Sequence, residues 1–408
     1  MNAHFQFFTK KSVAGLSLAI IFYGAQAVVA APDPGDHWVG TWGASQQLTE
    51  PRNLPPPPGL TSNTLRQVVH VSVGGKHLRV RFSNVFGTNP VTMSSVHLAL
   101  SDGRSAIKTN SDQMLVFHGK TSVTIPAGES VLSDTFDFDL APLSDLAATI
   151  RFDGTSGHVT GHPGSRSTSY LQTGDAVSAS DMLTATRTQH WYILNGIDVE
   201  AEPSSAAIVA LGDSITDGRG SGTDKNDRWP DNLARRLQAD HDTANIAVLN
   251  EGIGGNCVLR GGLGPTALSR FDRDVLSQSG VRWLIILEGV NDIGSSHDTS
   301  VATNLIEAYE NMIGQAHARH IRVYGATILP FGNSGYNSPA HEAARQKVND
   351  WIRSSGKFDA VIDFDAALRD PQNPSHLVLL VDSGDHLHPN ERGYRMMADT
   401  VDLKLFEK

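Results

Sequence analysis

The stretch "ALGDSITDG", residues 210–218, decides the fold predicted for the second half of the chain. Asp213 and Ser214 stand where an apolar run ends and the chain is expected to turn into a helix. One interpretation is helix-capping chemistry, because Asp and Ser both favour such positions. The other is that Ser214 is a nucleophile at the carboxyl edge of a sheet. The second interpretation requires a base, an orienting carboxylate and oxyanion donors from the rest of the chain.

Short apolar runs recur from about residue 204 onward, and each ends in Gly or polar residues. They are "AAIVALGD", "NIAVLNEG", "WLIILEGVND", "IRVYGATILP" and "DAVIDFD". Helical patterns lie between them, and in 300–319 six apolar residues share one helical face: Leu305, Ile306, Tyr309, Met312, Ile313 and Ala316. Strands that alternate with helices predict an α/β domain, here 204–408, with a parallel sheet covered on both sides.

The first half of the chain has a different period. Residues 36–200 alternate apolar and polar positions with turn residues between the runs. In "VVHVSVGGKHLRVRFS" the alternation continues on both sides of Gly74 and Gly75, which predicts a β-hairpin. We therefore expect an antiparallel β-sandwich domain over 36–200, with the boundary in "EAEPSS" at 200–205.

The composition suits a two-domain globular protein. The chain has 408 residues, and its formal net charge is −10 without a long basic run. This balance argues against nucleic acid or an anionic membrane surface as the main partner. The only cysteine, Cys257, is predicted to be a small buried hydrophobic residue.

Residues 1–30 are predicted to be a secretory signal peptide. Lys10 and Lys11 precede an apolar core that ends in small residues, with cleavage expected after Ala27 or Ala30. The alternative is a retained membrane anchor, although the apolar run is short for a full span. We expect a secreted or periplasmic protein without membrane insertion after processing.

Four polar sites follow the candidate strands, where ligands bind in parallel sheets. Ser214 follows the first strand, "NEGIGGN" (250–256) the second, "GVND" (289–292) the third and "DHLHPN" (385–390) the last. His388 is the candidate base, and Asp385 is the carboxylate that would orient it. The backbone N–H groups of Ser214 and Gly255 and the side-chain amide of Asn291 are the candidate oxyanion donors.

Each site has a simpler explanation when it is taken alone. A D-x-x-H pair also occurs as a helix cap beside a solvated histidine, Asn291 could be a turn residue, and Gly255 a tight bend. "HLH" at 386–388 suggests a metal, but a metal needs a third ligand with its own local pattern. All four sites in one order, each behind a candidate strand, favour the catalytic interpretation.

These residues resemble the SGNH or GDSL esterase/lipase hydrolases. The matching residues are Ser214 in "GDSITDG", Gly255 in "NEGIGG", Asn291 in "GVND", and Asp385 with His388 in "DHLHP". The resemblance covers roughly 206–405, and its one departure is "GDSI" for the usual "GDSL". It implies a flavodoxin-like sheet, a Ser–His–Asp triad without metal or organic cofactor, and ester hydrolysis. "VGTWGAS" and "LRQVVHVSVGG" resemble the β-domain that precedes the catalytic domain in some secreted bacterial members.

The substrate prediction is an ester of a small molecule or polysaccharide, with short acyl groups on carbohydrate or similar alcohols. A lipase or lysophospholipase, a transacylase and a non-catalytic carbohydrate-binding protein remain as alternatives. Trp229, like Trp42 and Trp191, is a candidate for stacking on a sugar ring, with core packing as the alternative. Tyr336, in the loop "PFGNSGYNSP" (330–339), is a candidate substrate contact, and the alternative is a role in fixing the domain interface.

Overall fold

The computed structural model describes Met1 and residues 37–407. The predicted signal peptide, residues 1–30, lies outside the described residues except for Met1. His37–Lys408 forms one compact unit. Below, residues 38–200 are called the β-part and residues 206–406 the α/β part.

The α/β part is built on a parallel sheet of five strands in the order β17-β16-β18-β19-β20. The strands are β16 (Ala206–Gly212), β17 (Ile246–Gly252), β18 (Val281–Leu287), β19 (Arg322–Ala326) and β20 (Ala360–Ile362). Numbered along the chain, this order is 2-1-3-4-5, which is that of flavodoxin-like folds. The predicted fold is therefore confirmed. Every residue of β16 is buried, as expected for a central strand covered on both faces.

Eight α-helices lie in this part of the described chain. They are α1 (Ser214–Asp217), α2 (Trp229–Ala239), α3 (Ala267–Phe271), α4 (Val290–Ser295), α5 (Val301–His317), α6 (Pro339–Ser354), α7 (Phe364–Leu368) and α8 (Glu391–Thr400). The helix predicted within 300–319 is α5, and five of its six predicted core residues are buried, while Ile306 is half-buried at the edge. Among the described residues no helix is long and apolar enough to cross a membrane.

The ends of the three neighbouring strands are in register. Gly212 at the end of β16 pairs with Gly252 of β17 on one side and with Leu287 of β18 on the other. The turns that follow these three strands therefore emerge side by side. Ligands of open parallel sheets bind at such an edge, where the strand order reverses.

The β-part contains three antiparallel sheets. The first has β1 (Trp38–Gly43), β15 (Leu194–Glu200), β4 (Gly75–Ser83), β8 (Ser130–Leu132) and β9 (Phe136–Leu140). The second has β13 (Thr186–Thr188), β12 (Ser169–Thr173), β3 (Asn63–His70), β10 (Asp145–Gly154), β5 (Val91–Leu100), β6 (Gln113–Met114) and β7 (Val123–Ile125). The third is small, with β14 (Trp191–Tyr192), β11 (Thr160–His162) and β2 (Gln47–Leu48). The inner faces of the two larger sheets share one hydrophobic core.

The predicted hairpin around Gly74 and Gly75 is wrong. β3 pairs with β10 and β12 of one sheet, whereas β4 pairs with β15, β8 and β9 of the other. The chain crosses between the sheets at Val71 and Ser72, and the Ser72 N–H donates to Thr41 O near the end of β1. Alternating residues show that two strands exist, but they do not identify the partner of either strand.

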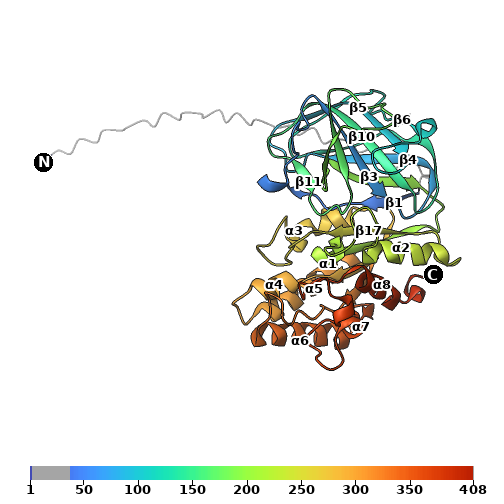
Figure 1. Cartoon of the computed structure of the whole chain (residues 1–408). Helices are drawn as coiled ribbons and strands as arrows, with labels where there is room; N and C mark the ends of the chain where they lie inside the picture. The colour runs from blue at the N-terminus through green and yellow to red at the C-terminus, as the bar shows by residue number, and fades with distance from the viewer. Residues whose placement is uncertain (2–36, 408) are drawn as a thin grey trace. The chain divides into compact units, whose positions relative to one another are not determined.

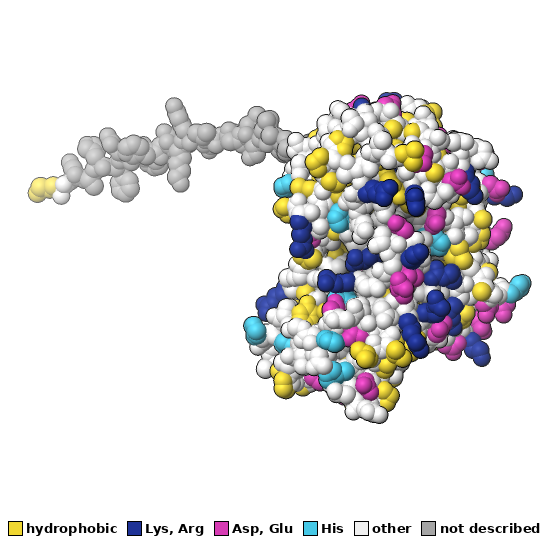
Figure 2. Space-filling view, viewed as in Figure 1, with side chains coloured by type: hydrophobic (Ala, Val, Ile, Leu, Met, Phe, Trp, Pro, Cys, Tyr) yellow, Lys and Arg dark blue, Asp and Glu magenta, His cyan; other side chains and the backbone are white. Residues whose placement is uncertain are grey.

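The β-part packs on the edge of the parallel sheet, where β1 lies beside β17 (Figure 1). Ala44 forms an isolated parallel bridge with Asn250 at the end of β17. A Cβ at Gly40 would come within 2.9 Å of Leu249, so glycine allows this close approach. Figure 2 shows basic and acidic side chains interspersed over the visible face.

Candidate active site

Ser214 is the first residue of α1, directly behind the central strand β16. The Asp213 carboxylate accepts the N–H of Ile215 at 2.8 Å, so Asp213 caps this single helical turn. Gly218 ends it with a φ of 96°, a conformation that favours glycine. The same turn thus contains the helix cap and Ser214. Ser214 is buried there, with 6% of the residue's surface exposed.

Asp385, His388 and Ser214 form a continuous chain of hydrogen bonds. Ser214 Oγ lies 2.7 Å from His388 Nε2, and His388 Nδ1 lies 2.7 Å from Asp385 Oδ2. Because a carboxylate only accepts, Nδ1 carries a proton, and Nε2 is then free to accept from the serine hydroxyl. Asp385 and His388 lie in a turn between a 3₁₀ segment at Leu379–Val381 and α8. This fourth site therefore does not directly follow a strand, contrary to the sequence prediction.

Burial and hydrogen bonding set the charges of this chain. Burial opposes the charged form of Asp385, but bonds from the N–H groups of His388 and Leu387 and from the imidazole hold its pKa at about 2. Burial lowers the pKa of His388 below its ordinary value, although Asp385 acts in the opposite direction. At neutral pH the pair is thus a carboxylate beside a neutral imidazole, which is the state that a general base requires.

The predicted oxyanion donors gather beside Ser214. Within residues 37–407, neither the Ser214 N–H nor the Gly255 N–H donates a hydrogen bond. Gly255 has a φ of 74° in the turn after β17, which a side chain would strain. Asn291, on α4, donates from Nδ2 to Asn256 O at 2.8 Å and keeps a second N–H on the same nitrogen. Gly255, Asn291, Ser214 and His388 line the same cavity.

Tyr336 lines this cavity as well, and its contacts lie on α4. Its hydroxyl donates to Asn291 Oδ1 at 2.9 Å. A Cβ at Gly294 would collide with the Tyr336 ring, so the ring lies against the helix backbone. His341 Nδ1, 2.7 Å from Tyr336 O, anchors the loop from the other side.

The structure contradicts the prediction that Trp229 stacks on a sugar ring. Its side chain has no solvent exposure, packs against Phe364 and donates from Nε1 to Thr216 Oγ1 at 3.3 Å. Trp42 and Trp191 are also buried and form an edge-to-face pair with ring centroids 5.0 Å apart. None of the three rings is available to stack on a substrate, because each lies in the hydrophobic core.

A fully buried arginine on α3 supports the edge of the sheet. Arg270 donates to Gly212 O at 3.0 Å and to Glu251 O at 2.7 Å, and so ties the ends of β16 and β17 together. Its Nε donates to Asn256 Oδ1 at 3.0 Å, which holds the turn that carries Gly255. The sequence analysis did not identify Arg270. The local sequence around an arginine does not show which distant carbonyl oxygens will accept its hydrogen bonds.

The β-part contacts the helical turn of Ser214 through His162, at the end of β11. His162 Nε2 lies 3.0 Å from Asp217 Oδ1, and Nδ1 lies 2.8 Å from Ser45 O. All three residues are buried. Asp217 is the last residue of α1, so this contact joins the β-part to the helical turn of Ser214. The sequence carries no local signal for a contact between residues that lie 55 positions apart.

The predicted catalytic side chains line a cavity of about 680 Å³ with walls from both parts of the protein. Ser214, Asn291, Tyr336 and His388 come from the α/β part. Six polar side chains come from the β-part: Gln47, Glu50, Arg52, Asn53, Arg166 and His190. Any molecule bound in this cavity beside Ser214 therefore contacts both parts.

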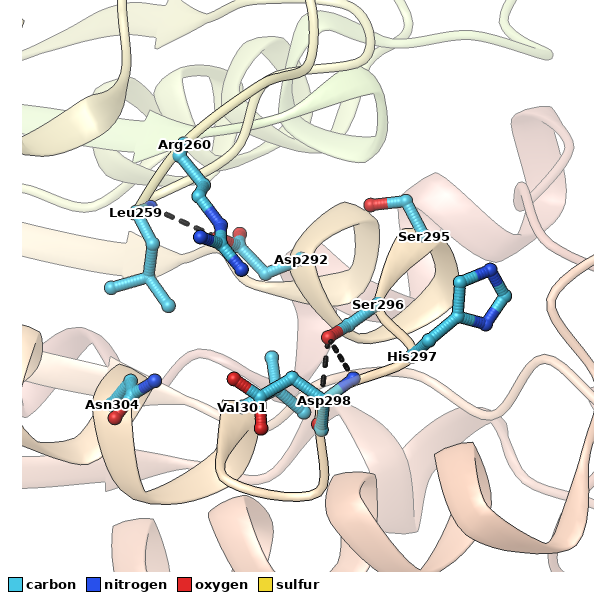
Figure 3. A pocket seen from close by; sticks show the side chains of 9 residues that line it. All are labelled: Leu259, Arg260, Asp292, Ser295, Ser296, His297, Asp298, Val301 and Asn304. Carbon is cyan, nitrogen blue, oxygen red and sulfur yellow. Dashed lines mark hydrogen bonds between the residues drawn. The ribbon is translucent and has the colours of Figure 1, made fainter.

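A second cavity of about 690 Å³ is lined by residues 259–260 of the loop after β17 and by residues of α4, α5 and the segment between these two helices (Figure 3). Its wall includes Asp292, whose two carboxylate oxygens accept the N–H groups of Val258 (2.8 Å) and Leu259 (2.9 Å). Asp292 thus stabilises the backbone at Val258 and Leu259. Within the described part of the chain, no three His, Cys, Asp or Glu side chains are grouped so as to hold a metal ion.

Comparison with known proteins points to one family. Residues 210–396 match the GDSL-like Lipase/Acylhydrolase family. No curated protein matches the chain. A GDSL-like lipase from Bacteroides thetaiotaomicron VPI-5482 has 20% identity and a TM-score of 0.36, with 49% of this chain and 87% of that chain covered. An acetylxylan esterase from Geobacillus stearothermophilus has 18% identity and a TM-score of 0.37, with 49% of this chain and 94% of that chain covered.

Proposed function

Residues 210–396 belong to the GDSL-like lipase/acylhydrolase family, and from that premise we propose that the protein hydrolyses carboxylic esters through Ser214, His388 and Asp385. One observation carries the proposal: the unbroken chain from Ser214 Oγ to His388 to Asp385, with 2.7 Å at each step. A serine hydroxyl is a weak nucleophile without such a base. The neutral imidazole supports His388 in that role.

The reaction proceeds in two halves. Ser214 Oγ attacks the ester carbonyl carbon while His388 Nε2 takes the hydroxyl proton, and Asp385 stabilises the imidazolium. His388 then returns the proton to the alcohol oxygen as the C–O bond breaks, which leaves an acyl group on Ser214. Water, deprotonated by His388, attacks the carbonyl carbon of this acyl-enzyme. His388 then returns the proton to Ser214 Oγ as the bond from Oγ to the acyl carbon breaks, and the carboxylic acid is released. The Ser214 and Gly255 N–H groups and Asn291 Nδ2 stabilise the oxyanion in both halves.

The preferred substrates are short acyl esters of carbohydrate or similar alcohols. The polar side chains that the β-part contributes to the cavity wall support this class over long-chain lipids. Buried polar groups left without partners by a hydrocarbon chain cost about 1–3 kcal/mol each. A lipase, a lysophospholipase or a transacylase would use the same three residues, so the substrate range separates these alternatives.

The experiment is an acyl-chain-length series of p-nitrophenyl esters together with acetylated xylan. We expect acetyl and butyryl esters to be hydrolysed fastest, and Ser214→Ala to lower kcat by about four orders of magnitude. Near-wild-type turnover by folded Ser214→Ala contradicts the mechanism. A preference for long acyl chains contradicts the substrate class, and transfer of the acyl group to an added alcohol indicates a transacylase.

We also propose that the protein acts outside the cytoplasm, in the periplasm or the medium. The proposal rests on the pattern of residues 1–30 and is tested by the N-terminal sequence and mass of the protein recovered from each fraction. A mature N-terminus near Val28 or Ala31 is expected. A full-length chain in the membrane fraction would indicate a retained anchor.

A further inference from the structure

The two walls of the active-site cavity differ in their share of apolar side chains. The α/β part contributes the proposed catalytic residues, the charged side chains of Asp217 and Arg219, and apolar groups from Leu263, Leu387 and the Tyr336 ring. Of the cavity-lining side chains that the described β-part contributes, all carry hydrogen-bonding groups except Pro163 and Gly164. The wall from the β-part therefore needs a polar ligand to satisfy its groups when water leaves the cavity.

Glu50 is a carboxylate held in place by two amides. Its Oε1 accepts from Gln47 Nε2 at 2.7 Å, and its Oε2 accepts from Asn53 Nδ2 at 2.9 Å. Asn53 is fixed in turn, because Asn53 O accepts the hydroxyl of the buried Tyr192 at 2.7 Å. Each carboxylate oxygen keeps capacity for a further bond. Glu50 is therefore a preoriented acceptor on the cavity wall.

His190 presents a second acceptor. Its Nδ1 lies 2.7 Å from Pro163 O, and since a carbonyl only accepts, Nδ1 carries the proton. Burial lowers the pKa of His190, so the ring is neutral at neutral pH. Nε2 then holds a lone pair and makes no hydrogen bond to residues 37–407. A ligand hydroxyl can donate to it.

Arg166 supplies the donors. Its Nε is buried and has no hydrogen-bond partner within the described chain. Its Nη2 lies 3.9 Å from Asp217 Oδ2, which is beyond hydrogen-bond distance. Arg166 lines the same cavity as Ser214, so its guanidinium can donate to a molecule bound there.

Acceptors and donors on one wall match a ligand whose groups both donate and accept, and hydroxyls have this property. The Glu50 carboxylate would repel a simple anion, and the Arg166 guanidinium would repel a cation. We propose that Glu50, His190 and Arg166 form the alcohol subsite of the esterase and bind the hydroxyl groups of a polyhydroxylated, sugar-like alcohol. This inference rests on the proposed function, in which that alcohol is the leaving group.

The experiment compares two acetyl esters with rings of similar size: an acetylated xylopyranoside and cyclohexyl acetate, which lacks the hydroxyls. The measured quantity is the ratio of kcat/KM for the sugar ester to kcat/KM for cyclohexyl acetate. A hydrogen bond to a charged group contributes about 1.5–3 kcal/mol, so we expect Glu50→Gln and Arg166→Gln each to lower this ratio by about tenfold or more. His190→Phe, which keeps a ring but removes Nε2, is expected to lower it by a smaller factor.

Glu129→Gln is the matched control, because Glu129 is an exposed carboxylate of the β-part outside the cavity wall. It is expected to leave the ratio at the wild-type value. An unchanged ratio in both Glu50→Gln and Arg166→Gln, with melting temperatures near that of the wild type, overturns the subsite. Failure of the proposed function has a different signature: Ser214→Ala would then hydrolyse both esters, whatever the ratio.

Discussion

The Tyr336 hydroxyl donates a hydrogen bond of 2.9 Å to Asn291 Oδ1. Asn291 Nδ2 donates to Asn256 O at 2.8 Å, so both ends of the amide are held. Because the Asn256 carbonyl only accepts, Nδ2 must face it, and Oδ1 then faces the Tyr336 hydroxyl, which donates to it. Tyr336 thus helps to hold the Asn291 amide in place beside the proposed oxyanion site.

Tyr336→Phe tests this relationship. Phenylalanine keeps the ring against Gly294 but loses the bond to Asn291. One neutral hydrogen bond contributes about 0.5–1.5 kcal/mol, so we expect kcat for p-nitrophenyl acetate to fall by up to about tenfold, with KM little changed. Steady-state kinetics and a melting curve, the latter expected to change by only a few degrees, provide the measurement.

A double-mutant cycle separates positioning from a direct substrate contact. Asn291→Ala removes a proposed oxyanion donor and should lower kcat by about 10²–10³. If Tyr336 acts through Asn291, Tyr336→Phe has no further effect on kcat in the Asn291→Ala background. Additive losses in the double variant would show that Tyr336 acts on the substrate independently.

The pH dependence of kcat/KM should follow His388. Burial lowers the pKa of His388, and the base must be neutral to accept the proton from Ser214. As pH falls, the neutral form therefore persists below the pKa of an ordinary histidine, which is about 6.5, and the acid limb of the profile should lie below that value. Rates measured between about pH 4 and 8 test this, and an acid limb above about 6.5 would contradict it.

The parts of the fold that follow from local pattern could be predicted. A buried parallel strand is a continuous apolar run, and β16, β17 and β18 each end in the Gly or polar residues that carry the site. The partner of a strand is not a local property, which is why the hairpin prediction at Gly74 failed. Trp229 failed for a related reason, because an aromatic residue in a sequence does not reveal whether the fold surrounds it.

Sequence patterns predicted the residues that the α/β part contributes to the site, but not those from the β-part. Ser214, Gly255, Asn291 and the Asp385–His388 pair lie in short stretches with recognisable chemistry, and the structure brings them into one cavity. The other wall comes from three separated segments of the β-part, near residues 50, 166 and 190. None of these segments carries a local sequence motif that indicates a site. The three segments come together only in the folded β-part.

His162 provides a test of how the β-part supports the catalytic turn. His162→Phe keeps an aromatic ring but leaves Asp217 Oδ1 and Ser45 O without their partner. A buried polar group left without its hydrogen-bond partner costs about 1–3 kcal/mol, so we expect the free energy of unfolding in urea to fall by at least about that amount. Adding Asp217→Asn should recover part of the loss. A change below about 1 kcal/mol would show that this contact is dispensable.

The last prediction concerns stability and Glu251, which is fully buried at the end of β17. Its Oε2 accepts the Ser45 hydroxyl at 2.7 Å. Burial, and after it the charge of Asp274, raise the pKa of Glu251 from 4.5 to about 8. Between pH 4.5 and about 8, Glu251 is therefore protonated in the folded protein but ionised in the unfolded chain. The stabilising contribution of this proton is therefore complete below pH 4.5 and is lost as pH rises toward 8.

Glu251→Gln keeps the shape of the side chain and removes its titration. We expect the free energy of unfolding of this variant, measured in urea at several pH values, to decline less than that of the wild type between about pH 5 and 8. Some decline remains, because burial also raises the pKa of Asp213, to about 7. The exposed Glu129→Gln serves as the control and should keep the wild-type slope. A Glu251→Gln slope equal to that of the wild type would mean that Glu251 is already ionised in the folded protein at neutral pH.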